Sequence, residues 1–137
     1  MDMLFNDRYN QTYFDPTTLL HYNTKKADTK YMSEDEFKEL LINWKNSVLA
    51  NNPKLILVDN QQFSFPISPD LQLWMVKHIS TPVLQLPSVE KFCFVMSKDF
   101  ISKISMDQFT NEANNDTKKN KIKYFGDLEE AKKWLLE

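Results

Sequence analysis

The chain has 137 residues and a single glycine, Gly126, where average usage would give about ten. This shortage excludes the glycine-rich loops that bind dinucleotides and nucleoside triphosphates, and also the Gly-x-Ser-x-Gly nucleophile elbow. One cysteine (Cys93) and two histidines (His21 and His78) exclude an intrachain disulfide and the common zinc sites. The formal net charge of −2 gives no electrostatic reason to bind nucleic acid.

Targeting signals are not expected at the amino terminus. Residues 1–7 contain no basic segment followed by a sustained apolar one, so they do not resemble a signal peptide. No apolar stretch approaches the roughly 20 residues that a membrane span needs. A lone cysteine fits a reducing compartment. We therefore expect one cytoplasmic domain over residues 1–137, without a membrane span.

The first half of the chain predicts a hairpin, a helix and a buried strand. Strands at 8–14 and 18–24 are separated by a turn that begins Asp15-Pro16. Ser33-Glu34-Asp35-Glu36 is a capping box, and apolar residues at helical spacing predict a helix over 34–50. The apolar run within 54–59 is typical of a strand covered on both faces.

The second half continues the alternation of helices and strands. After a polar loop, the predicted elements are a helix over 68–79, a strand over 89–96, a helical region over about 98–114, a strand over 122–125 and a closing helix over 128–136.

The element order is therefore β-β-α-β-α-β-α-β-α. Strands that alternate with helices predict an α/β domain with a mostly parallel sheet. The opening hairpin would supply antiparallel edge strands, one of which carries His21, so the sheet would be mixed. We expect four to five strands and about four helices.

The main candidate for a functional residue is Asp59, at the carboxyl end of a predicted central strand. Ligands of open α/β sheets bind outside the carboxyl ends of the strands. Ser68 would cap the next helix, whose N-terminus offers free N–H groups to an anion. The alternative is structural: Asp59 would accept backbone hydrogen bonds from its loop, and Ser68 would serve only as a cap.

Catalysis has little support in the sequence. Asp59, a histidine and a serine (Ser64 or Ser68) are the components of a hydrolytic triad, but no elbow glycine exposes a nucleophile. Cys93 lies between two phenylalanines in a predicted strand, which indicates a buried packing residue. We predict no enzyme activity, no catalytic residues, no cofactor and no metal.

The carboxyl-terminal segment carries a family resemblance. Residues 124–135, Tyr-Phe-Gly-Asp-Leu-Glu-Glu-Ala-Lys-Lys-Trp-Leu, resemble the ending of SpoIIAA-like proteins of the STAS type, named after sulfate transporters and anti-sigma-factor antagonists. The resemblance covers most of residues 9–136 and continues in three further segments: Leu57-Val58-Asp59, Pro69 to Trp74, and Lys91 to Val95.

The resemblance implies a SpoIIAA-like fold with helices mainly on one side of a small sheet, and a regulatory or binding role. In the antagonist members a serine after the central strand, in an Asp-Ser-Ser-Gly-like context, is phosphorylated by a partner kinase. Only Asp59 of that context is present here, since Asn60, Gln61 and Gln62 replace the serines and the glycine. No phosphorylation site is therefore transferred; Ser64 and Ser68 are substitutes by location only.

Two functional hypotheses follow. The first is a non-enzymatic STAS-like module that binds a protein partner or forms a homodimer. Its surface would be the loop and helix start around Asp59, Phe63, Phe65, Ser68 and Trp74, with the aromatic residues as anchors. The second is a carrier of a small lipophilic or anionic ligand, with a pocket near Asp59 and Ser68.

Overall fold

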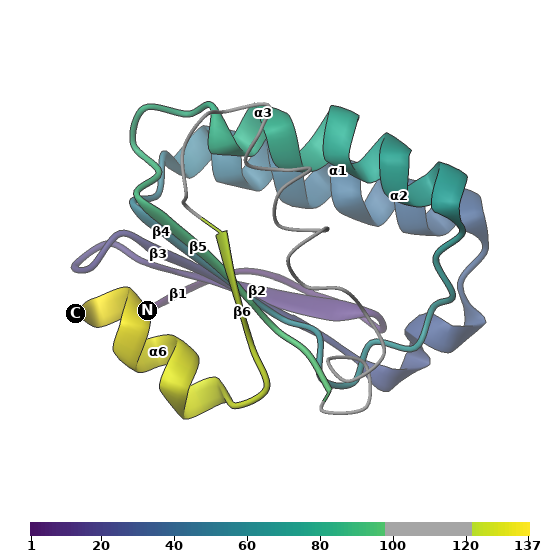
Figure 1. The fold of residues 1–137 in the computed structure, drawn as a ribbon, viewed down its shortest axis with the longest axis horizontal. Coiled ribbons are helices and arrows are strands. Elements are labelled where there is room, and N and C mark those ends of the chain that lie inside the picture. The colour runs from purple at the N-terminus through teal and green to yellow at the C-terminus, as the bar shows by residue number, and fades with distance from the viewer. Residues whose placement is uncertain (98–121) are drawn as a thin grey trace.

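The computed structural model describes residues 1–97 and 122–137, which form a mixed six-stranded sheet with helices on both faces (Figure 1). The strands lie in the sheet in their order along the chain: β1 (Asp2–Asn6), β2 (Asn10–Asp15), β3 (Leu20–Lys25), β4 (Leu55–Asp59), β5 (Lys91–Val95) and β6 (Ile122–Phe125). The helical region predicted over 98–114 lies outside the described residues.

The strand directions confirm the predicted α/β class and the mixed sheet. β1, β2 and β3 pair antiparallel, whereas β3, β4, β5 and β6 pair parallel. The predicted element order contains five strands and the described residues form six, because β1 was not predicted. All five residues of β1 are exposed, so the strand has no alternation of apolar and polar positions by which to recognise it.

The helices begin where the sequence places their caps. Ser33 and Glu36 form the predicted capping box of α1 (Glu34–Asn51), and Ser68 accepts a hydrogen bond from the backbone of Leu71 at the start of α2 (Pro69–Met75). Before α1, a single 3-10 turn, η1, spans Ala27–Tyr31. The closing helix α6 spans Leu128–Leu136.

The second helix is longer than predicted. α2 continues without a break through a π-helical turn, η2 (Val76–Ser80), into α3 (Thr81–Leu84). The π turn directly precedes the turn that contains Pro82, a residue with no backbone N–H to pair with a carbonyl of the preceding turn. The wider turn therefore lets the helix continue past Pro82, beyond the predicted end at residue 79.

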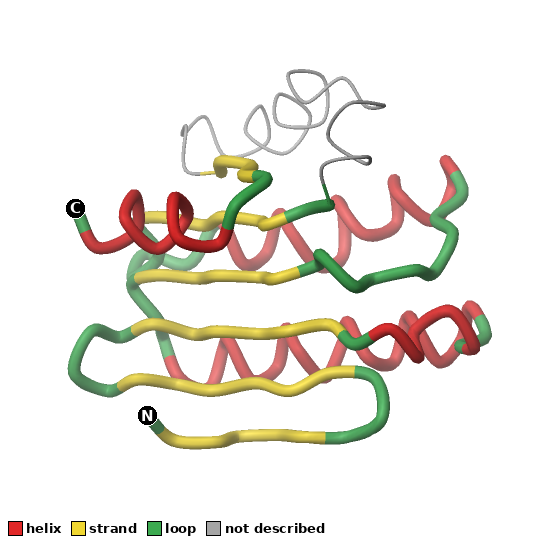
Figure 2. The backbone as a smooth tube through the Cα atoms, turned by 90° about the horizontal axis from the view of Figure 1, so that it is seen from below, coloured by secondary structure: helices red, strands yellow, loops and turns green. Residues whose placement is uncertain are grey.

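Helices cover the two faces of the sheet unequally. α1 and the α2–α3 helix lie on one face, and α6 lies on the other (Figure 1). Figure 2 shows that α6 covers the β4–β6 side of its face only, in agreement with its contacts. The larger core lies under α1 and α2–α3, and the smaller core lies under α6.

His21 and Cys93 are both packing residues in the interior. Because β3 lies between β2 and β4, it is not the edge strand that the sequence suggested, and His21 is completely buried. Its Nε2 shares a 2.6 Å hydrogen bond with the Oγ of Ser47, and burial lowers its pKa to about 4. Cys93 is also fully buried, and burial raises the pKa of its thiol to about 12.

Candidate functional site

Asp59 lies at the carboxyl end of β4, in the middle of the parallel part of the sheet, as predicted. Its side chain is 8% exposed, and Oδ1 accepts a 3.0 Å hydrogen bond from the backbone N–H of Gln61. Ser68 uses its hydroxyl to cap α2. Among the described residues no hydrogen bond joins Asp59 to Ser68. Both residues thus have the structural roles that the sequence left open as an alternative.

The three aromatic residues of the predicted binding surface pack against the molecule itself. The rings of Phe63 and Phe65 lie 5.5 and 4.8 Å from that of Phe37, on α1. The ammonium of Lys38 lies 5.2 Å from the centre of the Trp74 ring. All three predicted anchors are half-buried and contact the larger core, so they hold the loop and α2 in place.

Sequence reasoning missed a row of buried polar residues on the face that α1 covers. Asn10 lies opposite Lys25 and Thr12 lies opposite Asn23 across β2 and β3, and each of the four is at most 4% exposed. The sequence signal that could have revealed this row is the presence of polar residues at every second position of two paired strands, because such residues share one face of the sheet.

Asn23 is the centre of this row. Its Nδ2 donates 2.8 Å hydrogen bonds to the Oδ1 of Asn10 and to the Oγ1 of Thr12. With both acceptors on the nitrogen side, the oxygen Oδ1 faces the other way and accepts from the Nζ of Lys25. The amide therefore fixes the direction of the lysine side chain.

Lys25 is a buried cation without an anionic partner. It is 4% exposed, and in the part of the chain that the structure describes no ion pair includes it. Loss of solvation lowers the pKa of Lys25 to about 7, and the negative charge of Asp59 opposes this shift. At neutral pH the amine is thus close to the midpoint of its titration.

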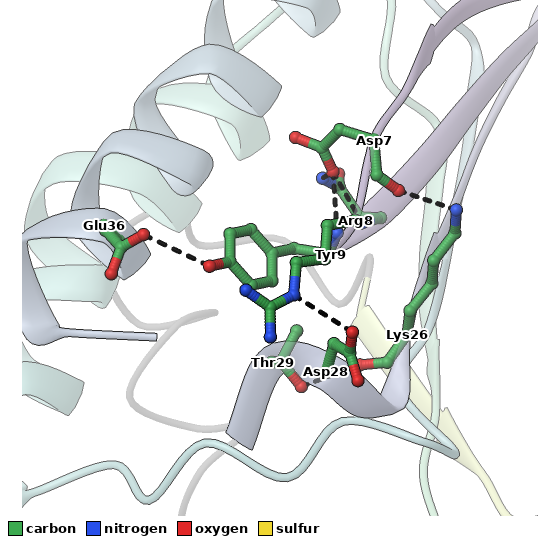
Figure 3. A network of polar contacts seen from close by, with 8 residues as sticks. Asp7, Arg8, Tyr9, Lys26, Asp28, Thr29 and Glu36 are labelled. Carbon is green, nitrogen blue, oxygen red and sulfur yellow. Dashed lines mark hydrogen bonds and ion pairs between the residues drawn. The ribbon is translucent and has the colours of Figure 1, made fainter. Parts of the chain in front are cut away.

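A polar network next to Lys25 joins the start of β2 to η1 and α1 (Figure 3). The Nε of Arg8 pairs with Asp28 at 3.0 Å, and the hydroxyl of Tyr9 donates to Glu36 at 3.2 Å. The Nζ of Lys26 donates to the backbone carbonyl of Asp7 at 2.7 Å. These contacts hold η1 and the start of α1 beside the carboxyl end of β3, where Lys25 lies.

A cavity of about 50 Å³ lies between this end of the sheet, α1 and the α2–α3 helix. Lys25 is its sole charged lining residue among those described, and Asn60 and Ser80 are polar. The other lining residues are apolar or aromatic: Phe37, Leu41, Trp44, Val58, Phe63, Ile67, Met75, Ile79, Phe92 and Phe94. The pocket expected near Asp59 and Ser68 is thus lined instead by their neighbours Val58, Asn60 and Ile67.

A larger hollow of about 350 Å³ lies at the opposite end of the sheet, between the β2–β3 turn and the end of α6. Of its four charged lining residues, Glu137 is exposed to solvent and the other three already have partners. Lys54 and Glu90 form an ion pair at 3.6 Å, and Lys91 donates to the backbone carbonyl of Trp134 at 2.7 Å. The smaller cavity is therefore the stronger candidate for a ligand site.

The edge strand β1 is a second candidate site. Met3, Leu4 and Phe5 are 55%, 40% and 40% exposed, and β1 pairs with β2 alone. No strand of the described residues pairs with the backbone groups on its outer side, and such an edge is a template for another strand.

Comparisons with known proteins do not assign the chain to a family. No family model, curated protein or solved structure matches it. Within residues 1–97 and 122–137, no cluster of histidine, cysteine and acidic residues has the arrangement of a metal site. The helices described include none that is both long enough and apolar enough to cross a membrane.

Proposed function

We propose that the chain is a non-enzymatic cytoplasmic binding module of the STAS type, and that it associates with a second copy of itself through β1. The carrying observation is the exposure of every residue of this edge strand. The position of α1 and α2–α3 on one face of the sheet supports the STAS-type interpretation, because the resemblance implies helices mainly on one side.

The sequence of β1 suits antiparallel self-pairing. When two copies pair around Leu4, Asp2 lies opposite Asn6 and Met3 lies opposite Phe5 of the second copy, so no like charges meet. The strand contains neither lysine nor proline, the residues with which many proteins block an exposed edge.

Sedimentation velocity over a range of concentrations tests this proposal. We expect wild-type protein to form dimers reversibly, and Leu4→Lys to weaken dimerisation by at least about tenfold, because the added charges repel across the edge. Leu49→Lys is the matched control, since Leu49 on α1 is 39% exposed and Leu4 is 40% exposed.

Three results would contradict the proposal. One is a wild-type chain that stays monomeric at millimolar concentration. The others are a Leu4→Lys variant that dimerises as strongly as wild type, or a Leu49→Lys variant that loses as much affinity as Leu4→Lys.

A further inference from the structure

The ammonium of Lys25 has more donors than acceptors. A protonated lysine offers three N–H donors, and residues 1–97 and 122–137 provide one acceptor, the Oδ1 of Asn23. A buried cation without an anion is unfavourable, because the interior replaces little of the solvation it loses. An anion that reached Lys25 would therefore gain a strong charge-assisted hydrogen bond.

The cavity gives an anion this access. Lys25 lines it together with the polar residues Asn60 and Ser80. Ile67, which is 37% exposed, also lines the cavity, so the lining extends from the buried amine to the surface of the protein.

The size and lining of the cavity restrict the ligand. A water molecule needs roughly 10–15 Å³ of such volume. The 50 Å³ present therefore accommodates about three to five groups of that size. Most of the lining is aromatic or aliphatic, which favours a ligand with an apolar end.

The single cation restricts the charge of the ligand. A phosphate carries up to two charges and several oxygens that each require donors, whereas a carboxylate carries one charge. The N-terminus of α2, the other anion-binding feature nearby, already receives the Ser68 cap. One ammonium in an apolar cavity thus matches a monocarboxylate.

We propose that this cavity is a binding site for a short-chain monocarboxylate, with the carboxylate paired to Lys25 and the aliphatic end among the rings of Phe37, Phe63 and Phe92. This site is independent of β1 and of self-association. Chains much longer than propionate exceed the cavity volume.

Two-dimensional ¹H–¹⁵N NMR titrations of the complete chain test the proposal, with sodium propionate as the probe. Propionamide has nearly the same shape without the charge, and octanoate has the charge with a longer tail. We expect saturable shifts around Lys25, Asn60 and Phe63 with propionate, and at least about tenfold weaker binding of both other compounds.

Lys25→Met removes the charge and retains an unbranched side chain, and we expect it to weaken propionate binding by at least about tenfold. Lys77→Met, at an exposed position of η2, is the control and should bind like wild type. Equal binding of propionate and propionamide, or undiminished binding to Lys25→Met, would show an apolar cavity without carboxylate recognition and overturn the proposal. So would the absence of saturable shifts. If Lys25→Met does not fold, the comparison of propionate with propionamide on wild-type protein still tests whether the cavity recognises the carboxylate.

Discussion

Lys25 and Asn23 lie two residues apart on β3 and point to the same face, where the ammonium of Lys25 donates to the side-chain oxygen of Asn23. The contact is part of a buried polar row beneath α1, in a place where most domains have apolar side chains. Two testable predictions concern this row. Two more concern the aromatic loop after β4 and the turn before β3.

The buried charge of Lys25 predicts an unusual dependence of stability on pH. The pKa is about 7 in the folded chain and 10.5 without the fold, so between these values the unfolded chain binds more protons. The free energy of unfolding should therefore rise as pH increases from about 7 towards 10. Lys25→Met should be more stable than wild type at pH 7 by roughly 1 kcal/mol, because it removes a buried cation.

Urea unfolding at pH 7 and pH 9 measures both effects, with Lys77→Met as the control for loss of a surface charge. The free energy of unfolding should rise less between pH 7 and pH 9 in Lys25→Met than in wild type. An identical pH dependence in wild type and Lys25→Met would contradict the burial of the charge.

Asn23 should be the most sensitive member of the row. Asn23→Ala leaves the Nζ of Lys25 and the acceptors on Asn10 and Thr12 without a partner, and we expect a loss of about 2–4 kcal/mol in the free energy of unfolding. A double-mutant cycle with Lys25→Met measures the contact directly. Asn23→Ala should lower the free energy of unfolding less in the Lys25→Met variant than in wild type. Equal losses in the two backgrounds would show that Asn23 and Lys25 do not interact.

The aromatic loop should contribute to stability. Phe65 stacks on Phe37 at 4.8 Å, so Phe65→Ala should lower the free energy of unfolding by about 1–3 kcal/mol. Leu73→Ala is the control, because Leu73 is 62% exposed and its truncation should cost less than about 0.5 kcal/mol. Equal effects of the two substitutions in thermal or urea unfolding would show that Phe65 does not anchor the loop.

Leu19 is the one apolar residue among the described positions with a left-handed backbone, at a φ of 58°. Only glycine adopts this region without steric cost, so Leu19→Gly should stabilise the chain by about 0.5–1 kcal/mol. Asn52, with a φ of 46°, provides the comparison: asparagine tolerates this region, and Asn52→Gly should gain less. A loss of stability in Leu19→Gly, measured by thermal unfolding, would contradict a strained turn.

Local patterns were sufficient for much of the fold. Ser33 and Ser68 cap the helices that the sequence assigns to them, and Asp59 ends the buried strand that the run Leu-Ile-Leu-Val predicts. These features depend on neighbours within a few residues, since caps and hydrophobic periodicity act over one turn or one strand. Even the role of Asp59 as an acceptor for its own loop was among the sequence's alternatives.

The Lys25 site depended on contacts that no local pattern contains. In the sequence, Asn23 lies near the end of the strand predicted over 18–24 and begins a polar stretch that continues through Lys25 to Lys30. The strand becomes interior because β2 and β4 flank it, and Lys25 is buried in a cavity that it shares with residues of α1. Whether a residue is buried depends on the elements that cover it, and these can be distant in the sequence. The sequence alone therefore determined the α/β class and the helix starts, and the tertiary structure decided which polar side chains face the cavity.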